Sequence, residues 1–201
     1  MPMSSDRMAS VSSQNSKAPS NFPDQWHSQA VQNKVAQMNK ELVFGGDDGD
    51  CFYGGVAKQL GKDMTEVRQD LHDFTDGLLK RNSSQMLYGE INRDDLADDV
   101  KSGRIKSTGK SGEFLFGRLV AERYNRPVKI LSYDAHSGKA AEHVFNPINS
   151  DKDPIILAYN GDMLDARKGG RFDAVMDKQQ PQQNYNVSYV ADHEFVNGYM
   201  Q

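Results

Sequence analysis

The sequence predicts an α+β domain, with helices in the first part of the chain and strands in the last. Between residues 24 and 124, apolar residues recur at helical spacing in several separate segments. After Pro127 the spacing becomes that of extended chain, and short apolar runs alternate with glycine and proline. Helices and strands that follow one another in separate runs are typical of α+β domains rather than of alternating α/β folds.

The chain of 201 residues is long enough for one domain with a core and a tail. Residues 1–22 are rich in serine, contain few aliphatic or aromatic residues, and lack the apolar stretch of a secretory signal. We therefore expect a disordered Ser-rich tail over 1–22 and a single domain over 23–201. The alternative is that the tail is an uncleaved export signal of the kind that bacterial effectors carry.

Helices are expected over 24–40, from Cys51 to Gly61, from Asp63 to Arg81, over 92–101 and over 113–124. In the first, Val31 and Val35 have helical spacing. Gly61 is a typical C-terminal stop, and Asp63 with Glu66 has the spacing of an N-terminal cap. Ser111 is expected to cap the last helix.

Strands are expected over 128–133, 143–145, 155–159 and 172–176, and a further one over 185–190. These segments are rich in β-branched and aromatic residues, and glycines or prolines separate them. Residues 179–183 (QQPQQ) are expected to form a short linker.

The composition limits the functions to be considered. The net charge of −4 predicts no general affinity for nucleic acid, and no apolar run approaches the roughly 20 residues of a membrane-spanning helix. A single cysteine cannot form an internal disulfide. It fits a reducing compartment such as the cytoplasm, or a catalytic thiol.

Cys51 follows the glycine-rich acidic turn 45–50 (GGDDGD) and stands at the start of an expected helix. Backbone N–H groups and the helix dipole at such a position favour a thiolate and could hold an oxyanion. The other interpretation is a buried cysteine that acts as a small apolar residue, the usual fate of a lone cysteine.

Three segments in order resemble the ovarian-tumour (OTU) family of cysteine peptidases. Residues 48–53 (DGDCFY) resemble the family's nucleophile motif, and 110–131 (KSGEFLFGRLVAERYNRPVKIL) its segment of glycine, helix and Pro-led strand. Residues 155–159 and 170–175 (GRFDAV) resemble its closing strands. The resemblance covers about 42–176. It implies a papain-like fold with helices packed on a small, mostly antiparallel sheet.

The resemblance also implies roles for individual residues. Cys51 would be the nucleophile, Asp48 would lie in the oxyanion loop, and Asp173 would orient the catalytic imidazole. The sequence departs from the family at two positions: Ser111 stands where a tryptophan is usual, and Arg171 stands where the histidine belongs.

Arg171 changes the expected chemistry. A cysteine peptidase needs a group that takes the thiol proton and later returns one to the leaving amine. Histidine suits this step, whereas arginine stays protonated at working pH. Arg171 could stabilise a Cys51 thiolate, or pair with Asp173 in an empty site. His193 is the histidine near enough in sequence to replace the missing base, although a surface position is the simpler expectation for it.

No cofactor or metal is expected. The glycines of 103–111 have five residues between them where a phosphate-binding loop needs four, and no downstream glutamate completes a calcium loop after Asp47. His136 and His143 lack zinc-ligand spacing to a cysteine or carboxylate.

The resemblance therefore implies a deubiquitinase that hydrolyses isopeptide bonds to ubiquitin or a ubiquitin-like modifier. Its partners would be that modifier and the proteins that carry it. Two alternatives stay open: an impaired pseudo-deubiquitinase that binds without cleaving, and a structural or inhibitory module unrelated to ubiquitin. Retention of Cys51 favours the enzyme, and Arg171 favours the pseudo-enzyme.

Overall fold

A computed structural model describes residues 26–46, 49–89, 91–102, 105, 114–147, 150–161 and 170–178 of the chain. Its helices are α1 (Gln29–Gln37), α2 (Cys51–Leu60), α3 (Met64–Arg81), α4 (Arg93–Lys101) and α5 (Leu115–Tyr124). Its strands are β1 (Lys40–Val43), β2 (Met86–Leu87), β3 (Ile91–Asn92), β4 (Val128–Asp134), β5 (Lys139–Phe145), β6 (Ile155–Tyr159) and β7 (Phe172–Asp177).

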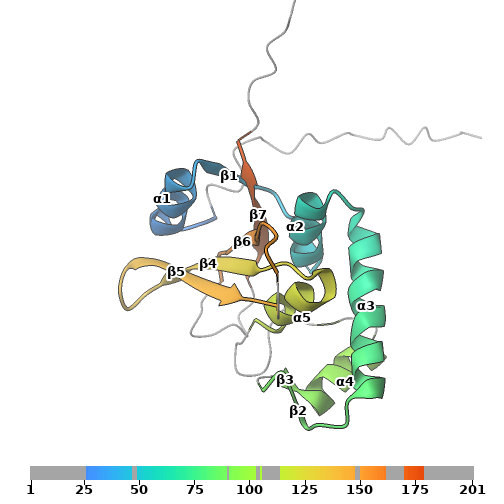
Figure 1. The fold of residues 1–201 in the computed structure, drawn as a ribbon. Coiled ribbons are helices and arrows are strands. Elements are labelled where there is room, and N and C mark those ends of the chain that lie inside the picture. Colours follow the sequence, from blue (N-terminus) through green and yellow to red (C-terminus); the bar gives the residue numbers. More distant parts are fainter. Residues whose placement is uncertain are drawn as a thin grey trace, which may run out of the picture.

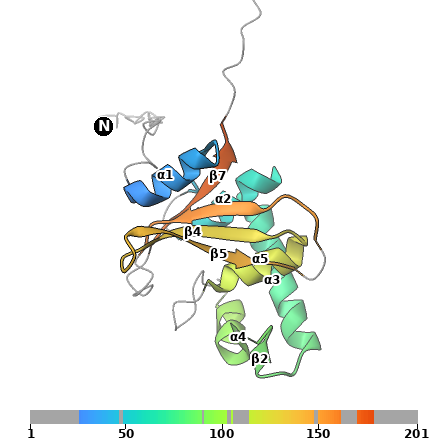
Figure 2. The ribbon, with the colours of Figure 1, turned by 60° about the vertical axis from the view of Figure 1, so that its left-hand side comes forward.

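Five strands form the central sheet in the order β1-β7-β6-β4-β5. Only the β4–β6 pair is parallel among its four strand pairs in the described chain, so the sheet is mostly antiparallel as predicted. Helix α1 lies on one side of the sheet, and α2, α3 and α5 lie on the other (Figures 1 and 2). Helix α4 and the β2–β3 hairpin sit at the far end of α3 (Figure 1). The predicted α+β fold is confirmed.

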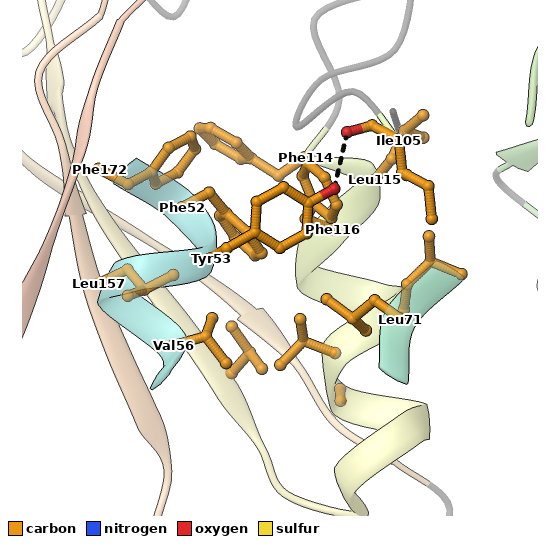
Figure 3. Close-up of a cluster of buried hydrophobic side chains, with 14 of the residues drawn as sticks. Phe52, Tyr53, Val56, Leu71, Ile105, Phe114, Leu115, Phe116, Leu157 and Phe172 are labelled. Atoms are coloured by element: carbon orange, nitrogen blue, oxygen red, sulfur yellow. Dashed lines mark hydrogen bonds between the residues drawn. The ribbon is translucent and has the colours of Figure 1, made fainter. Parts of the chain in front are cut away.

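The two sides of the sheet have separate apolar cores. On the α1 side, Val31 and Val35 pack against Ile156 and Val175. On the other side, Phe52 and Tyr53 of α2 meet Phe116 of α5 and Phe172 of β7 (Figure 3). The hydroxyl of Tyr53 donates to the carbonyl of Ile105, 3.3 Å away. Every residue of α2 from Cys51 to Ala57 is buried.

Most expected elements occur near their predicted bounds, and the differences have local causes. The first helix is shorter than 24–40 because Ser28 caps it, accepting a hydrogen bond from the N–H of Val31, and because Asn39 leaves helical geometry at a φ of 56°. Strand β1 then follows, which the sequence did not predict. The strand expected at 143–145 is longer and begins at Lys139.

Some predictions lie outside the described residues: the tail 1–22, Ser111 and its cap, the linker 179–183 and the strand at 185–190. The cap predicted at Asp63 is confirmed, since its side chain accepts from the N–H of Thr65 at 2.7 Å. Gly61 ends α2 in the left-handed conformation, also as expected.

Within the described residues, none of the helices combines the length and apolar character that crossing a bilayer requires.

Candidate functional site

The turn before α2 places Cys51 against the closing strand. Cys51 is the first residue of α2, and its Sγ accepts a hydrogen bond from the backbone N–H of Phe172, 3.3 Å away. Asp50, at the helix cap, forms an ion pair with Arg68 of α3 at 3.3 Å. Phe52 contacts Phe116 of α5 and Phe172 of β7, and these contacts hold this end of α2 against both elements (Figure 3).

Two glycines allow this close packing. A Cβ on Gly45 would lie 2.2 Å from the carbonyl oxygen of Phe172 and 2.5 Å from that of Cys51. A Cβ on Gly54 would lie 1.7 Å from the carbonyl oxygen of Gly45. The backbones of the turn, α2 and β7 therefore meet at a point where no side chain fits.

Cys51 is 6% exposed, and the pKa of its thiol is raised above the ordinary value. Burial is the largest cause, because it disfavours the charged thiolate. The N–H of Phe172 and the charge of Arg171 act in the opposite direction, and the carboxylate of Asp173 raises the pKa further. The helix start, which we expected to favour a thiolate, is thus outweighed by burial.

Asp173 is fully buried in β7, and both of its carboxylate oxygens have protein donors. Oδ1 accepts from the N–H of Gly45 at 2.8 Å. Oδ2 lies 2.9 Å from Nε2 of His27, whose side chain is also fully buried. The carboxylate thus ties the segment before α1 and the turn before Cys51 to the closing strand.

Arg171, two residues before Asp173, reaches the same turn. Its guanidinium donates to the carbonyl of Gly46, and its backbone N–H donates to Oδ1 of Asn160 at 2.8 Å. The guanidinium carbon lies 4.0 Å from the ring centroid of Trp26 and 4.4 Å from that of Phe44. Only 8% of the residue is exposed.

Three of the predicted site residues, Cys51, Arg171 and Asp173, therefore lie together. Arg171 immediately precedes β7 and Asp173 lies within it, and their side chains contact two adjacent residues of the turn, Gly46 and Gly45. Asp48 and His193 lie outside the described residues.

Sequence reasoning missed His27, and it looked for a replacement histidine only near Arg171 in the chain. Strand β1 explains why His27 lies near the closing strand, since it pairs antiparallel with β7, with Val43 opposite Ala174. The segment before α1 is thereby brought to β7, 146 residues away in sequence. A signal for strand β1 in residues 40–43 (KELV) would have been needed to find this, and their apolar pattern is weak.

Among the residues that the structure describes, no three histidine, cysteine, aspartate or glutamate side chains gather closely enough to hold a metal ion. What the site offers is one thiol, one cation and one carboxylate at the junction of a helix start and a strand.

No protein-family model matches the sequence, and no curated protein does either. Among solved structures, the chain is similar to the OTU domain of OTUD1, with a TM-score of 0.52 and 17% identity over 73% of this chain and 91% of that one. It is also similar to an OTU deubiquitinase from Wolbachia pipientis bound to ubiquitin, with a TM-score of 0.44 and 13% identity over 70% and 97% of the two chains.

Proposed function

Since this chain has the fold of an OTU domain, we propose that it is a cysteine hydrolase of the deubiquitinase type, acting on isopeptide bonds to ubiquitin or a ubiquitin-like modifier. The observation that carries the proposal is the position of Cys51. Its sulfur lies at the start of a helix and accepts a hydrogen bond from the N–H of Phe172. In sequence, Phe172 stands between the two positions at which the family resemblance implies the base and its orienting partner.

In the proposed reaction the Cys51 sulfur bonds to the carbonyl carbon of the isopeptide, and the bond from that carbon to the lysine nitrogen breaks. The nitrogen must receive a proton as it leaves. Water then cleaves the thioester, which restores the thiol and releases the carboxyl group of the modifier. Backbone N–H groups at the start of α2, with the turn that contains Asp48, would hold the oxyanion.

Arg171 limits the rate of this reaction. Its charge lowers the pKa of the Cys51 thiol, which helps the attack, but a guanidinium cannot give a proton to the leaving amine at neutral pH. General acid–base catalysis typically contributes about 10²–10⁴-fold. We therefore propose that the native chain cleaves slowly, with Asp173 in the position to orient an imidazole.

A second candidate is a protein that binds ubiquitin or another partner without cleaving. The contacts of the buried Arg171 with two aromatic rings favour it, because they give the arginine a defined place in the site. In either case the partners would be the modifier and the proteins that carry it. The lone thiol suits a reducing compartment such as the cytoplasm, and export into a host cell as an effector is a further proposal that rests on the serine content of the tail.

The test uses ubiquitin with a thiol-reactive C-terminus, followed by mass spectrometry of the full chain. We expect an adduct on Cys51 that Cys51→Ala abolishes. Alkylation by a small reagent without an adduct from the ubiquitin probe would contradict ubiquitin recognition, and no reaction with either would identify a structural cysteine.

The same chain with Arg171→His separates enzyme from binding protein. We expect faster cleavage of a ubiquitin substrate, and a loss of that gain when Asp173→Ala is added. A native chain that is already fast and that Arg171→His leaves unchanged would show that another residue is the base. An Arg171→His chain that binds ubiquitin without cleaving would support the second candidate.

A further inference from the structure

Two adjacent residues before α1 each hold one of the two charged residues beside Cys51. Trp26 lies over the guanidinium of Arg171, 4.0 Å from ring centroid to Cζ. His27 lies 2.9 Å from the carboxylate of Asp173. The resemblance that pointed to Cys51, Arg171 and Asp173 begins near residue 42 and does not include this pair.

The contact between His27 and Asp173 is enclosed on all sides. Both side chains are 0% exposed, so water does not compete for the hydrogen bond. Because a carboxylate only accepts, Nε2 carries the proton in this bond. Among the described residues Nδ1 of His27 is buried and has no hydrogen-bond partner, so the polar contact of the ring is directed at Asp173 alone.

The guanidinium of Arg171 contacts a second ring besides that of Trp26. The ring centroid of Phe44 lies 4.4 Å from the guanidinium carbon, and the carbonyl of Gly46 accepts a hydrogen bond from the guanidinium. Cation–π attraction is strongest with tryptophan and increases when the cation is shielded from water. Trp26 therefore helps to hold a positive charge that acts on the Cys51 thiol.

We propose that Trp26 and His27 are positioning residues of the Cys51 site, acting through Arg171 and Asp173. Trp26 keeps the Arg171 cation beside the turn that leads to Cys51. His27 orients the Asp173 carboxylate and offsets its negative charge. Together they set the field in which the thiol ionises. The proposal deepens the proposed function, but its test requires only Cys51 and no ubiquitin.

The experiment measures the alkylation rate of Cys51 by iodoacetamide between pH 7 and 9.5 in the full chain. Arg171 lowers the pKa of the thiol and Asp173 raises it. Trp26→Leu releases the cation, and His27→Leu removes a donor from the carboxylate. Each is expected to move the profile to higher pH and to slow alkylation at pH 8 by about threefold.

Conservative and distant variants supply the controls. Trp26→Phe keeps an aromatic face and His27→Gln keeps an N–H donor, so both should restore a profile close to the native one. Tyr133→Leu removes an exposed aromatic residue from β4 and should leave the profile unchanged. Circular dichroism measures the helix content of each variant, and only variants with native helix content are compared.

An unchanged profile in folded Trp26→Leu and His27→Leu overturns the proposal. So does faster alkylation, which would mean that the two residues only shield the thiol. If a leucine variant does not fold, the alkylation profiles of Trp26→Phe and Trp26→His, or of His27→Gln and His27→Asn, are compared instead. Equal profiles within a pair overturn the proposal. These alkylation rates can be measured whether or not the chain recognises ubiquitin. A failure of the proposed function can therefore be told apart from a failure of this proposal.

Discussion

The Cys51 sulfur is subject to influences of opposite sign. Burial and the carboxylate of Asp173 favour the neutral thiol, whereas the Phe172 N–H and Arg171 favour the thiolate, and the net effect is a raised pKa. A helix start alone would have given the opposite direction. At neutral pH the folded chain therefore holds Cys51 mainly as the neutral thiol.

From this follows a prediction on the thiol itself. A raised pKa makes the thiolate rarer at neutral pH, so native Cys51 should react with iodoacetamide several-fold more slowly at pH 7.5 than the same cysteine in the urea-unfolded chain. The ratio should shrink as the pH rises. Mass spectrometry of timed samples measures both rates, and a native thiol that reacts faster than the unfolded one would contradict the prediction.

His143 gives a prediction on stability. It lies half-buried on β5, with Nε2 3.2 Å from Oγ of Ser132, and burial lowers its pKa. The unfolded chain then binds a proton at this residue at higher pH than the folded chain does. The contribution to stability is complete above the ordinary histidine pKa, about 6.5, and is lost as the pH falls through the folded value.

Urea unfolding midpoints at pH 8 and pH 5 measure this effect. The urea midpoint of the native chain should be lower at pH 5 than at pH 8. In His143→Gln this difference between the two midpoints should be smaller. His136→Gln, at an exposed position, is the matched control and should leave the difference unchanged. An equal difference in His143→Gln and the native chain would show that other groups carry the pH dependence.

At the scale of elements, two helical glycines should respond to alanine in opposite ways. In α2, a Cβ on Gly54 would lie 1.7 Å from the Gly45 carbonyl oxygen. Gly54→Ala should therefore cost about 1–3 kcal/mol in unfolding free energy. In α3, a Cβ on Gly77 would meet only the flexible end of Arg81, 3.3 Å away. Gly77→Ala should gain about 0.5–1 kcal/mol, because alanine is the better helix former.

Urea denaturation of both variants checks the pair. The sign is the decisive result, since both substitutions add one methyl group to a helix. A Gly54→Ala chain as stable as the native one would mean that α2 and the turn before it are not packed as described.

The elements that the sequence predicted well are those with strong local patterns. Helix α3 was predicted to within a residue because Asp63 caps it and Val67 and Leu71 mark a single buried face. Strand β6 was predicted at its observed bounds because all five residues are apolar or aromatic and buried on both faces. Strand β1 was missed because every one of its residues is only partly buried.

At the scale of the molecule, the sequence predicted the fold class and named three residues that lie together in the structure, and it missed the two residues that contact Arg171 and Asp173. Cys51, Arg171 and Asp173 stand in segments with a recognisable order. Trp26 and His27 reach the site only through the pairing of β1 with β7, and no local pattern encodes a contact between segments so far apart.

Truncation tests where the folded part begins. A chain that starts at residue 23 should melt within a few degrees of the full chain, since 1–22 offer little apolar surface to bury. A chain that starts at residue 29 also loses Trp26 and His27, and it leaves the buried Asp173 carboxylate without one donor. It should melt clearly lower. Scanning calorimetry measures both, and a large drop for the first chain would show that the tail packs on the domain.

The pairing of β1 with β7 also bears on how the protein is made. A ribosome delivers Cys51 and α2 long before Phe172, and until β7 arrives the thiol has neither its N–H donor nor its two charged neighbours. During that interval the cysteine is an ordinary one, open to oxidants and to other thiols in the cell. The last described strand thus completes the sheet and brings Phe172, Arg171 and Asp173 to the turn before α2 in the same event.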